Sequence, residues 1–68
     1  MMVHVYDNID AYNLWFNDLE HYLRSLFPGQ NVEVTMFENQ YRMKIPRRLA
    51  KKERRYICDR LRKEVYGF

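Results

Sequence analysis

Two short stretches in which every second residue is apolar lie between Asn31 and Pro46, and they constrain the fold more than any other feature of the sequence. Alternation with a period of two predicts β-strands that bury one face. A turn centred on Glu38-Asn39 suits the segment between them, because Asn accepts left-handed backbone conformations. The resulting hairpin, over about residues 31–45, pairs apolar side chains with one another: Met36 with Tyr41, Val34 with Met43, and Val32 with Ile45.

The charges on this hairpin support the same register. The turn that pairs the apolar residues also sets Glu33 opposite Lys44 on the outer face, which is a favourable cross-strand pair. A slip of one residue would place the apolar residues of one strand opposite the charged residues of the other. The hairpin prediction therefore rests on the alternation, the turn and the charges together.

A helix is expected before the hairpin, over about residues 8–27. Asp7-Asn8 supplies a cap for its start, Asp10 adds favourable charge in the first turn, and Pro28-Gly29 ends it. Apolar residues spaced three or four apart form one broad stripe along this segment, which predicts a face packed in the core. The stripe consists of Tyr12, Trp15, Phe16, Leu19, Tyr22, Leu23 and Leu26.

Two further segments complete the expected fold. Residues 2–6 alternate, so they form either a short strand or an extended arm. A second helix is expected over about residues 47–66, because Pro46 suits a helix start and apolar residues recur in its C-terminal half. The order (β)αββα predicts one small two-layer α+β domain over residues 1–68, with two helices on one face of a hairpin or three-stranded antiparallel sheet. With the first strand included, this is the order of a ferredoxin-like unit without its last strand.

Charge is distributed unequally along the chain. Residues 1–40 carry one base and six acids, and residues 41–68 carry eleven bases and three acids, so formal charges of −5 and +8 make up the net charge of +3. Four bases crowd the start of the second helix, where the helix dipole disfavours cations and no Ser, Thr, Asp or Asn supplies a cap: Arg47, Arg48, Lys51 and Lys52. An anion from outside the molecule would compensate this arrangement.

The basic helix predicts a binding function. The favoured hypothesis is a small protein that docks through this helix onto an acidic surface of another protein, as a phage or viral inhibitor or adaptor of a host factor would. Binding of the nucleic-acid backbone by the same helix, without sequence preference, is the alternative. The opposite charges of the two halves also favour a homodimer, or pairing within one chain. The residues expected to contact a partner are Arg47, Arg48, Lys51, Lys52, Arg55, Arg62 and Lys63 of the helix, and Arg42, Lys44 and Phe37 of the outer sheet face.

Other classes of function receive little support from the sequence. Sixty-eight residues with two helices offer little concavity, so no enzymatic activity, small-molecule substrate or cofactor is expected. His4 and His21 have no Cys or His neighbour at ligand spacing, so no metal site is expected. The lone Cys58, which we expect to be buried, cannot form an internal disulfide and indicates a reducing compartment. No apolar run could span a bilayer and no signal peptide is evident, so a cytoplasmic protein is expected.

Overall fold

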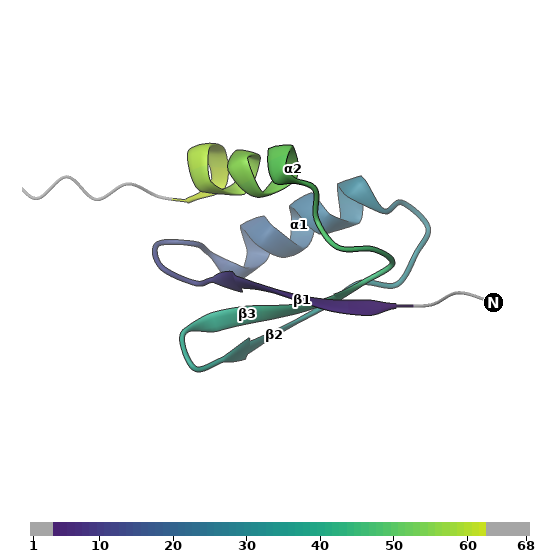
Figure 1. The fold of residues 1–68 in the computed structure, drawn as a ribbon, viewed down its shortest axis with the longest axis horizontal. Coiled ribbons are helices and arrows are strands. Elements are labelled where there is room, and N and C mark those ends of the chain that lie inside the picture. The colour runs from purple at the N-terminus through teal and green to yellow at the C-terminus, as the bar shows by residue number, and fades with distance from the viewer. Residues whose placement is uncertain (1–3, 63–68) are drawn as a thin grey trace, which may run out of the picture.

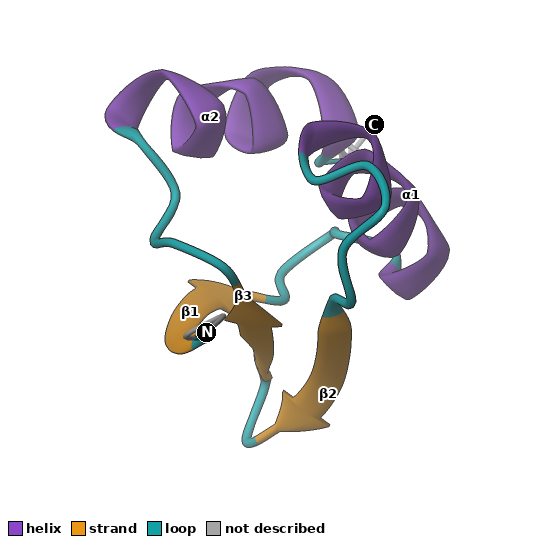
Figure 2. Ribbon diagram, turned by 90° about the vertical axis from the view of Figure 1, so that its right-hand side faces the viewer, coloured by secondary structure: helices purple, strands orange, loops and turns teal. Residues whose placement is uncertain are grey.

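The computed structural model describes residues 4–62, which form a three-stranded antiparallel sheet with helices packed on one face (Figure 1). The strands are β1 (Val5–Asp10), β2 (Glu33–Phe37) and β3 (Gln40–Ile45). The helical elements are α1 (Phe16–Leu26), α2 (Lys51–Tyr56) and a π-helical segment, η1 (Ile57–Leu61), that continues α2 directly. Figure 2 shows the two layers from the side, with the helices above the strands. The two-layer α+β prediction is confirmed. A first strand exists, but it spans Val5–Asp10 rather than the predicted residues 2–6, of which residues 2 and 3 lie outside the described part of the chain.

The strand order in the sheet is β1-β3-β2, and β3 is antiparallel to both of its neighbours. The segment containing α1 therefore connects two strands that run in the same direction with β3 between them. This is the split βαβ arrangement of ferredoxin-like units. It leaves β1 at one edge of the sheet and β2 at the other.

The β2–β3 hairpin has the predicted register. Val34 lies opposite Met43 and Glu33 opposite Lys44, and the ladder ends before a two-residue turn. β2 begins at Glu33, so the predicted pairing of Val32 with Ile45 lies outside the strand. Both turn residues adopt left-handed backbone angles, with φ of 47° at Glu38 and 64° at Asn39, as the type I′ turn of a tight hairpin requires.

The start of the first helix was predicted wrongly. Asp7, Asn8 and Asp10 belong to β1, and α1 begins only at Phe16. Six residues of β1 pair with β3, and this ladder outweighs the local capping signal of Asp7-Asn8. The connection then turns through Asn13, whose φ of 50° is incompatible with a right-handed helix. The predicted end is confirmed, since α1 stops at Leu26 and Gly29 adopts a φ of 76°.

The core lies between the inner face of the sheet and the helices. The apolar stripe is confirmed at Leu19 and Leu23, which are fully buried, while Tyr22 and Leu26 are partly buried against the core. It is wrong at its start, because two of its residues precede the helix: Tyr12 is 67% and Trp15 65% exposed. The sheet and the C-terminal helices contribute Ile9, Val34, Tyr41, Met43, Ile45 and Ile57, and the connecting segments contribute Leu14, Phe27, Val32 and Leu49.

The second helix begins later than predicted, at Lys51. Residues 46–50 form a link that bends at residues 46 and 47, and its last residue, Ala50, has the extended angles φ −74° and ψ 162°. Cys58 is exposed, which corrects the expectation that it is buried; its neighbour Ile57 faces the core instead. The predicted helical residues 63–66 lie outside the described part of the chain. Within residues 4–62, no helix is long and apolar enough to cross a membrane.

Candidate binding surfaces

An acid from within the chain caps the start of α2. The Glu53 carboxylate accepts a hydrogen bond from the Ala50 N–H at 2.7 Å. It also accepts hydrogen bonds from Arg47 Nη1 and Nη2, at 2.9 and 2.8 Å. Glu53 is the third residue of the helix, the position from which a carboxylate reaches back to the residue before it. The Arg47 hydrogen bond is the main cause that lowers the pKa of Glu53 to about 2. The helix start that lacks a capping side chain in the sequence is therefore satisfied internally.

Arg47 has several partners in the fold. Besides Glu53, its Nη1 donates to the carbonyl of Arg48 at 3.0 Å. Its guanidinium carbon also lies 5.1 Å from the centroid of the Phe27 ring, at the end of α1. This predicted site residue therefore holds the link before α2 against α1, although half of its side chain is exposed.

A second internal ion pair connects α2 to β1. Arg54 Nη1 lies 2.9 Å from Asp7 Oδ2, and Nη2 donates to the carbonyl of Asn8 at 2.8 Å. The same Asp7 oxygen accepts the N–H of Leu49 at 3.1 Å, and Asp7 Oδ1 accepts the Asn8 N–H at 2.9 Å. At this point the acidic half and the basic half of the sequence pair within one chain. The backbone of Asn8, on the outer edge of β1, is thereby occupied.

Four of the predicted cations in the link and on α2 are exposed and have no ion pair with any residue among 4–62. Arg48 lies in the link, and Lys51, Lys52 and Arg55 lie on α2. At about 100° per residue, these three α2 cations occupy the side of the helix opposite the buried Glu53. We call Lys51, Lys52 and Arg55 the basic face.

The C-terminal members of the predicted site are not part of the basic face. Arg62 is only partly exposed, and its Nη1 donates to the carbonyl of Tyr12, which fastens the end of η1 to the β1–α1 connection. Lys63 lies outside the described residues. Tyr56, which the sequence did not single out as a site residue, is 44% exposed directly after Arg55. Its ring stacks on that of Tyr22 of α1, with centroids 4.7 Å apart and an interplanar angle of 18°.

The remaining predicted residues lie on the outer face of the sheet, away from the helices. Met43 and Ile45 are fully buried on the inner face, so Arg42 and Lys44, which alternate with them, point to the other side. Phe37 is on this outer face as predicted and is 57% exposed. The predicted site therefore divides into two surfaces on opposite layers, and Arg42 and Lys44 do not extend the basic face.

The outer sheet face carries a row of aromatic and cationic side chains that spans all three strands. The Arg42 guanidinium carbon, on central strand β3, lies 5.6 Å from the centroid of Tyr6 on β1 and 5.6 Å from that of Phe37 on β2. Both rings are more than half exposed. We call Tyr6, Arg42 and Phe37 the aromatic row. Beside it lies an open hollow of about 190 Å³, lined by Tyr6, Glu33, Thr35, Arg42 and Lys44.

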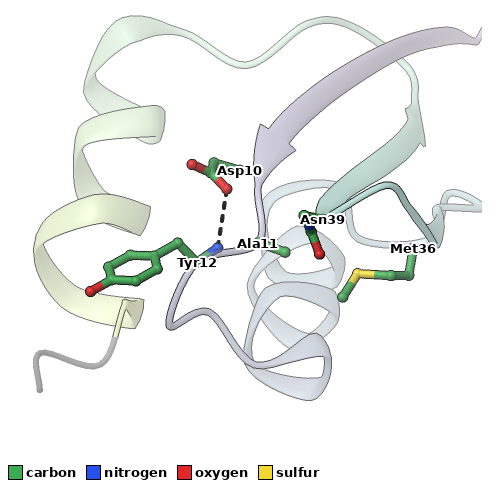
Figure 3. A pocket seen from close by; sticks show the side chains of 5 residues that line it. All are labelled: Asp10, Ala11, Tyr12, Met36 and Asn39. Atoms are coloured by element: carbon green, nitrogen blue, oxygen red, sulfur yellow. Dashed lines mark hydrogen bonds between the residues drawn. The ribbon is translucent and has the colours of Figure 1, made fainter.

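Another hollow, of about 370 Å³, lies at the end of the sheet next to the hairpin turn (Figure 3). Its lining residues are Asp10, Ala11, Tyr12, Met36 and Asn39. The Asp10 carboxylate accepts the Tyr12 N–H at 3.3 Å, so this acid stabilises the turn after β1. The exposed Met36 and Tyr12 side chains make the rest of the rim largely apolar.

No metal-binding arrangement is present in the described part of the chain, where no three His, Cys, Asp or Glu side chains are grouped to hold an ion. His21 is exposed on α1, and His4 Nε2 lies 3.0 Å from the Asn31 carbonyl.

Comparisons of the chain with protein-family models, curated proteins and solved structures found no match. The features of the molecule that can bind a partner are the basic face, the aromatic row and the edges of the sheet.

Proposed function

We propose that this protein is a non-enzymatic binding protein that docks through the basic face of α2 onto an acidic surface of another protein. The observation that supports this most directly is the division of the α2 charges. Arg54 forms an ion pair with Asp7, whereas Lys51, Lys52 and Arg55 are exposed and have no ion pair within residues 4–62. Cations left together in this way attract an acidic partner and direct its approach.

The spacing of these cations gives a further reason to expect an acidic partner. Lys51 and Arg55 are four residues apart, and Lys52 and Arg55 are three apart, so their charges repel along one side of the helix. Each such pair destabilises a helix by about 0.2–0.5 kcal/mol. Carboxylates of a partner would remove this repulsion on binding. The proposed interface therefore gains from the pairing that the fold itself does not provide.

Tyr56 favours a protein as the partner. It continues the exposed side of α2 after Arg55, and its stacking on Tyr22 fixes its ring before any partner arrives. Tyr and Arg are enriched among the residues that dominate protein–protein binding energy, and a preorganised ring loses little entropy on binding. The basic face together with Tyr56 thus combines cations that steer an acidic protein with a rigid aromatic contact.

The test is a pull-down with purified full-length protein from extracts of its native host, with and without nuclease, followed by affinity measurement on each protein captured. Lys52→Glu should abolish capture of a nuclease-resistant protein partner and leave the far-ultraviolet circular dichroism unchanged. Arg42→Glu, which makes the same charge change on the opposite layer, is the matched control and should capture normally. Loss of capture only in Arg42→Glu, or capture that nuclease abolishes, would contradict the proposal.

A second candidate function, nucleic-acid binding, is favoured by the aromatic row rather than by α2. Two exposed rings on an open sheet face offer flat surfaces for base stacking, and Arg42 and Lys44 lie beside them to approach phosphates. Stacking of this kind contributes about 1–3 kcal/mol per base and tolerates any sequence.

Titration of a labelled single-stranded oligonucleotide at about 50 mM and about 200 mM salt tests this candidate. Binding should weaken at the higher salt, and Phe37→Ala should weaken it further. Trp15→Ala is the control, because it removes a similarly exposed aromatic that lies directly before α1 and not in the aromatic row, and it should not weaken binding. Absence of binding at the lower salt would rule it out.

A further inference from the structure

The two edges of the sheet differ in whether their outward backbone groups have hydrogen-bond partners. On β1, the N–H of Asn8 is bonded to its neighbour Asp7, and its carbonyl receives Arg54. On β2, no backbone group is bonded to anything except β3 among the hydrogen bonds of residues 4–62. Figure 1 shows β2 along the border of the sheet, with no further strand beside it. The β1 edge is therefore blocked at Asn8 by side chains, whereas the β2 edge is open.

The hairpin turn determines which groups of β2 are free. A two-residue turn makes the flanking pair, Phe37 and Gln40, a hydrogen-bonded pair, and such pairs alternate along an antiparallel ladder. Every second residue back from Phe37 therefore bonds to β3. The two residues between them, Val34 and Met36, direct their N–H and C=O groups away from the sheet. These four groups form a regular template for another strand.

β2 also lacks the features that keep an exposed edge from pairing. Edge strands of soluble proteins commonly carry Lys, Pro or a bulge, or lie under a loop. β2 has the sequence EVTMF, with Glu33 as its one charge and no proline. Met36 on its inner face is 59% exposed and Phe37 on its outer face is 57% exposed. Both faces of the open edge therefore expose apolar surface at the same end.

We propose that a second copy of this chain pairs antiparallel with β2 about a twofold axis at Thr35, so that two three-stranded sheets join into one. This register overlaps all five residues of β2, which no other twofold register does. It brings Val34 opposite Met36 of the second copy, so that the free backbone groups of both bond to each other. It places no two like charges opposite one another, because Glu33 faces Phe37 of the second copy.

The side chains on this edge fit a second copy. On the inner face, the exposed Met36 comes to lie beside the buried Val34 of the other copy and extends its core. On the outer face, Glu33 of one copy approaches the Phe37 ring of the other, over which the Arg42 guanidinium already lies. An acid of each copy thereby nears a cation of the other. A core as small as that of this 68-residue chain gains stability from such an extension.

Sedimentation equilibrium of the full chain tests the proposal. We expect the wild-type protein to be a dimer, and Met36→Lys to raise the dissociation constant of the dimer by about tenfold or more, because it places a desolvated charge in the seam. Asn17→Lys makes a new cation at an exposed position of α1 and should leave the dimer unchanged. A wild-type monomer at the highest soluble concentration, or a Met36→Lys dimer of undiminished affinity, would overturn the proposal.

Amide hydrogen exchange of the wild-type protein tests the location of the seam without any substitution. In the dimer, the N–H groups of Val34 and Met36 are bonded to the second copy and should exchange slowly, and dilution below the dissociation constant should make them exchange fast. The Thr35 N–H bonds to β3 in either state and serves as the internal reference. A dimer in which Val34 and Met36 exchange fast at every concentration would show that the copies meet elsewhere.

Discussion

Glu53 is the single residue on which the second helix depends most. It is 7% exposed, and its carboxylate accepts hydrogen bonds from the Ala50 backbone and from both terminal nitrogens of Arg47. These contacts offset the removal of its charge from water. The acid lies among bases in the sequence, and its position three residues after Ala50 is the local signal that it caps the helix.

Replacement of this carboxylate tests its role. Glu53→Gln keeps the size of the side chain but weakens the bonds to Arg47 and Ala50, so the free energy of unfolding should fall by about 2 kcal/mol. Urea denaturation followed by circular dichroism measures this change. Glu20→Gln, which removes the exposed pair with Arg24, is the control and should lower stability by no more than about 0.5 kcal/mol. Equal effects of the two substitutions would contradict a special role for Glu53.

The same carboxylate makes stability depend on pH in the acid range. In the folded protein its pKa is lowered to about 2, against about 4.3 in an unfolded chain. Because the folded state holds the proton less tightly, the stabilisation is fully present above the unfolded pKa and is lost as pH falls toward the folded one. The stability difference between wild type and Glu53→Gln should therefore shrink between about pH 5 and about pH 2. A difference that stays constant over this range would exclude a lowered Glu53 pKa.

At the scale of elements, α2 and η1 are short, and their contacts with the rest of the molecule hold them in place. Arg54 joins α2 to β1 through Asp7, and Tyr56 stacks on α1. An isolated helix of this length would not persist in water. Ile57, fully buried, anchors the junction between the two helical segments. The C-terminal helix is thus stabilised by tertiary contacts rather than by its own propensity.

Asp7→Asn tests how strongly α2 depends on β1. The substitution removes the charge that Arg54 and the Leu49 N–H share, so we expect the free energy of unfolding to fall by about 2 kcal/mol, as for other partly buried bonds to a charged group. Asp59→Asn, at an exposed position of η1, is the matched control and should stay within about 0.5 kcal/mol of wild type. Thermal or urea denaturation measures the free energy of unfolding of both variants. A neutral Asp7→Asn would show that the pair with Arg54 contributes little.

The elements differ in how well the sequence predicts them. The hairpin could be predicted because the turn, the alternation and the pair of Glu33 with Lys44 are close in sequence and agree. The start of α1 could not be predicted, because β1 is stabilised by pairing with residues of β3 that are 30 to 40 positions away in sequence. Trp15 lies at helical spacing from Leu19 and continues the stripe by sequence alone. The pairing of residues 8–10 with residues 40–42 of β3 excludes them from the helix.

The candidate site was predictable in part for a similar reason. The basic residues of α2 and the outward position of Phe37 follow from local patterns. The pairing of Arg47 with Glu53 and of Arg54 with Asp7, which decides which cations stay exposed, depends on the folded chain. Tyr6 could have been placed beside Arg42 only by knowing that the first strand pairs with β3.

At the scale of the whole molecule, the charge polarity of the sequence is only partly neutralised within the fold. The described residues show one ion pair between the acidic N-terminal half and the basic C-terminal half, that of Asp7 with Arg54. Of the exposed cations without an ion pair among residues 4–62, Lys51, Lys52 and Arg55 lie over the helices and Arg42 lies on the sheet. In the proposed dimer the twofold axis is perpendicular to the joined sheet, so each layer presents two copies of its surface on the same side.

Arg54→Ala tests whether the closed edge limits assembly. Without the guanidinium, the Asn8 carbonyl loses its partner, and the outer edge of β1 becomes available for pairing. Light scattering at rising concentration should then detect species larger than a dimer, whereas the wild type should stop at two copies. Arg48→Ala, which removes an exposed base from the link, should behave as wild type. Growth of the wild type beyond a dimer, or none in Arg54→Ala, would refute this role.

The Arg54 side chain thereby limits the number of other sheets with which the sheet of one copy can pair. A β-sheet with two open edges can pair with another copy at each edge, as a bifunctional monomer does in a polymer, so copies can be added without limit. Arg54 on the carbonyl of Asn8 blocks the middle of the β1 edge, so in the proposed dimer each sheet pairs with one neighbour, through β2. If Arg54 acts in this way, it has the role of a chain stopper in a polymerisation, and it limits the proposed assembly to pairs.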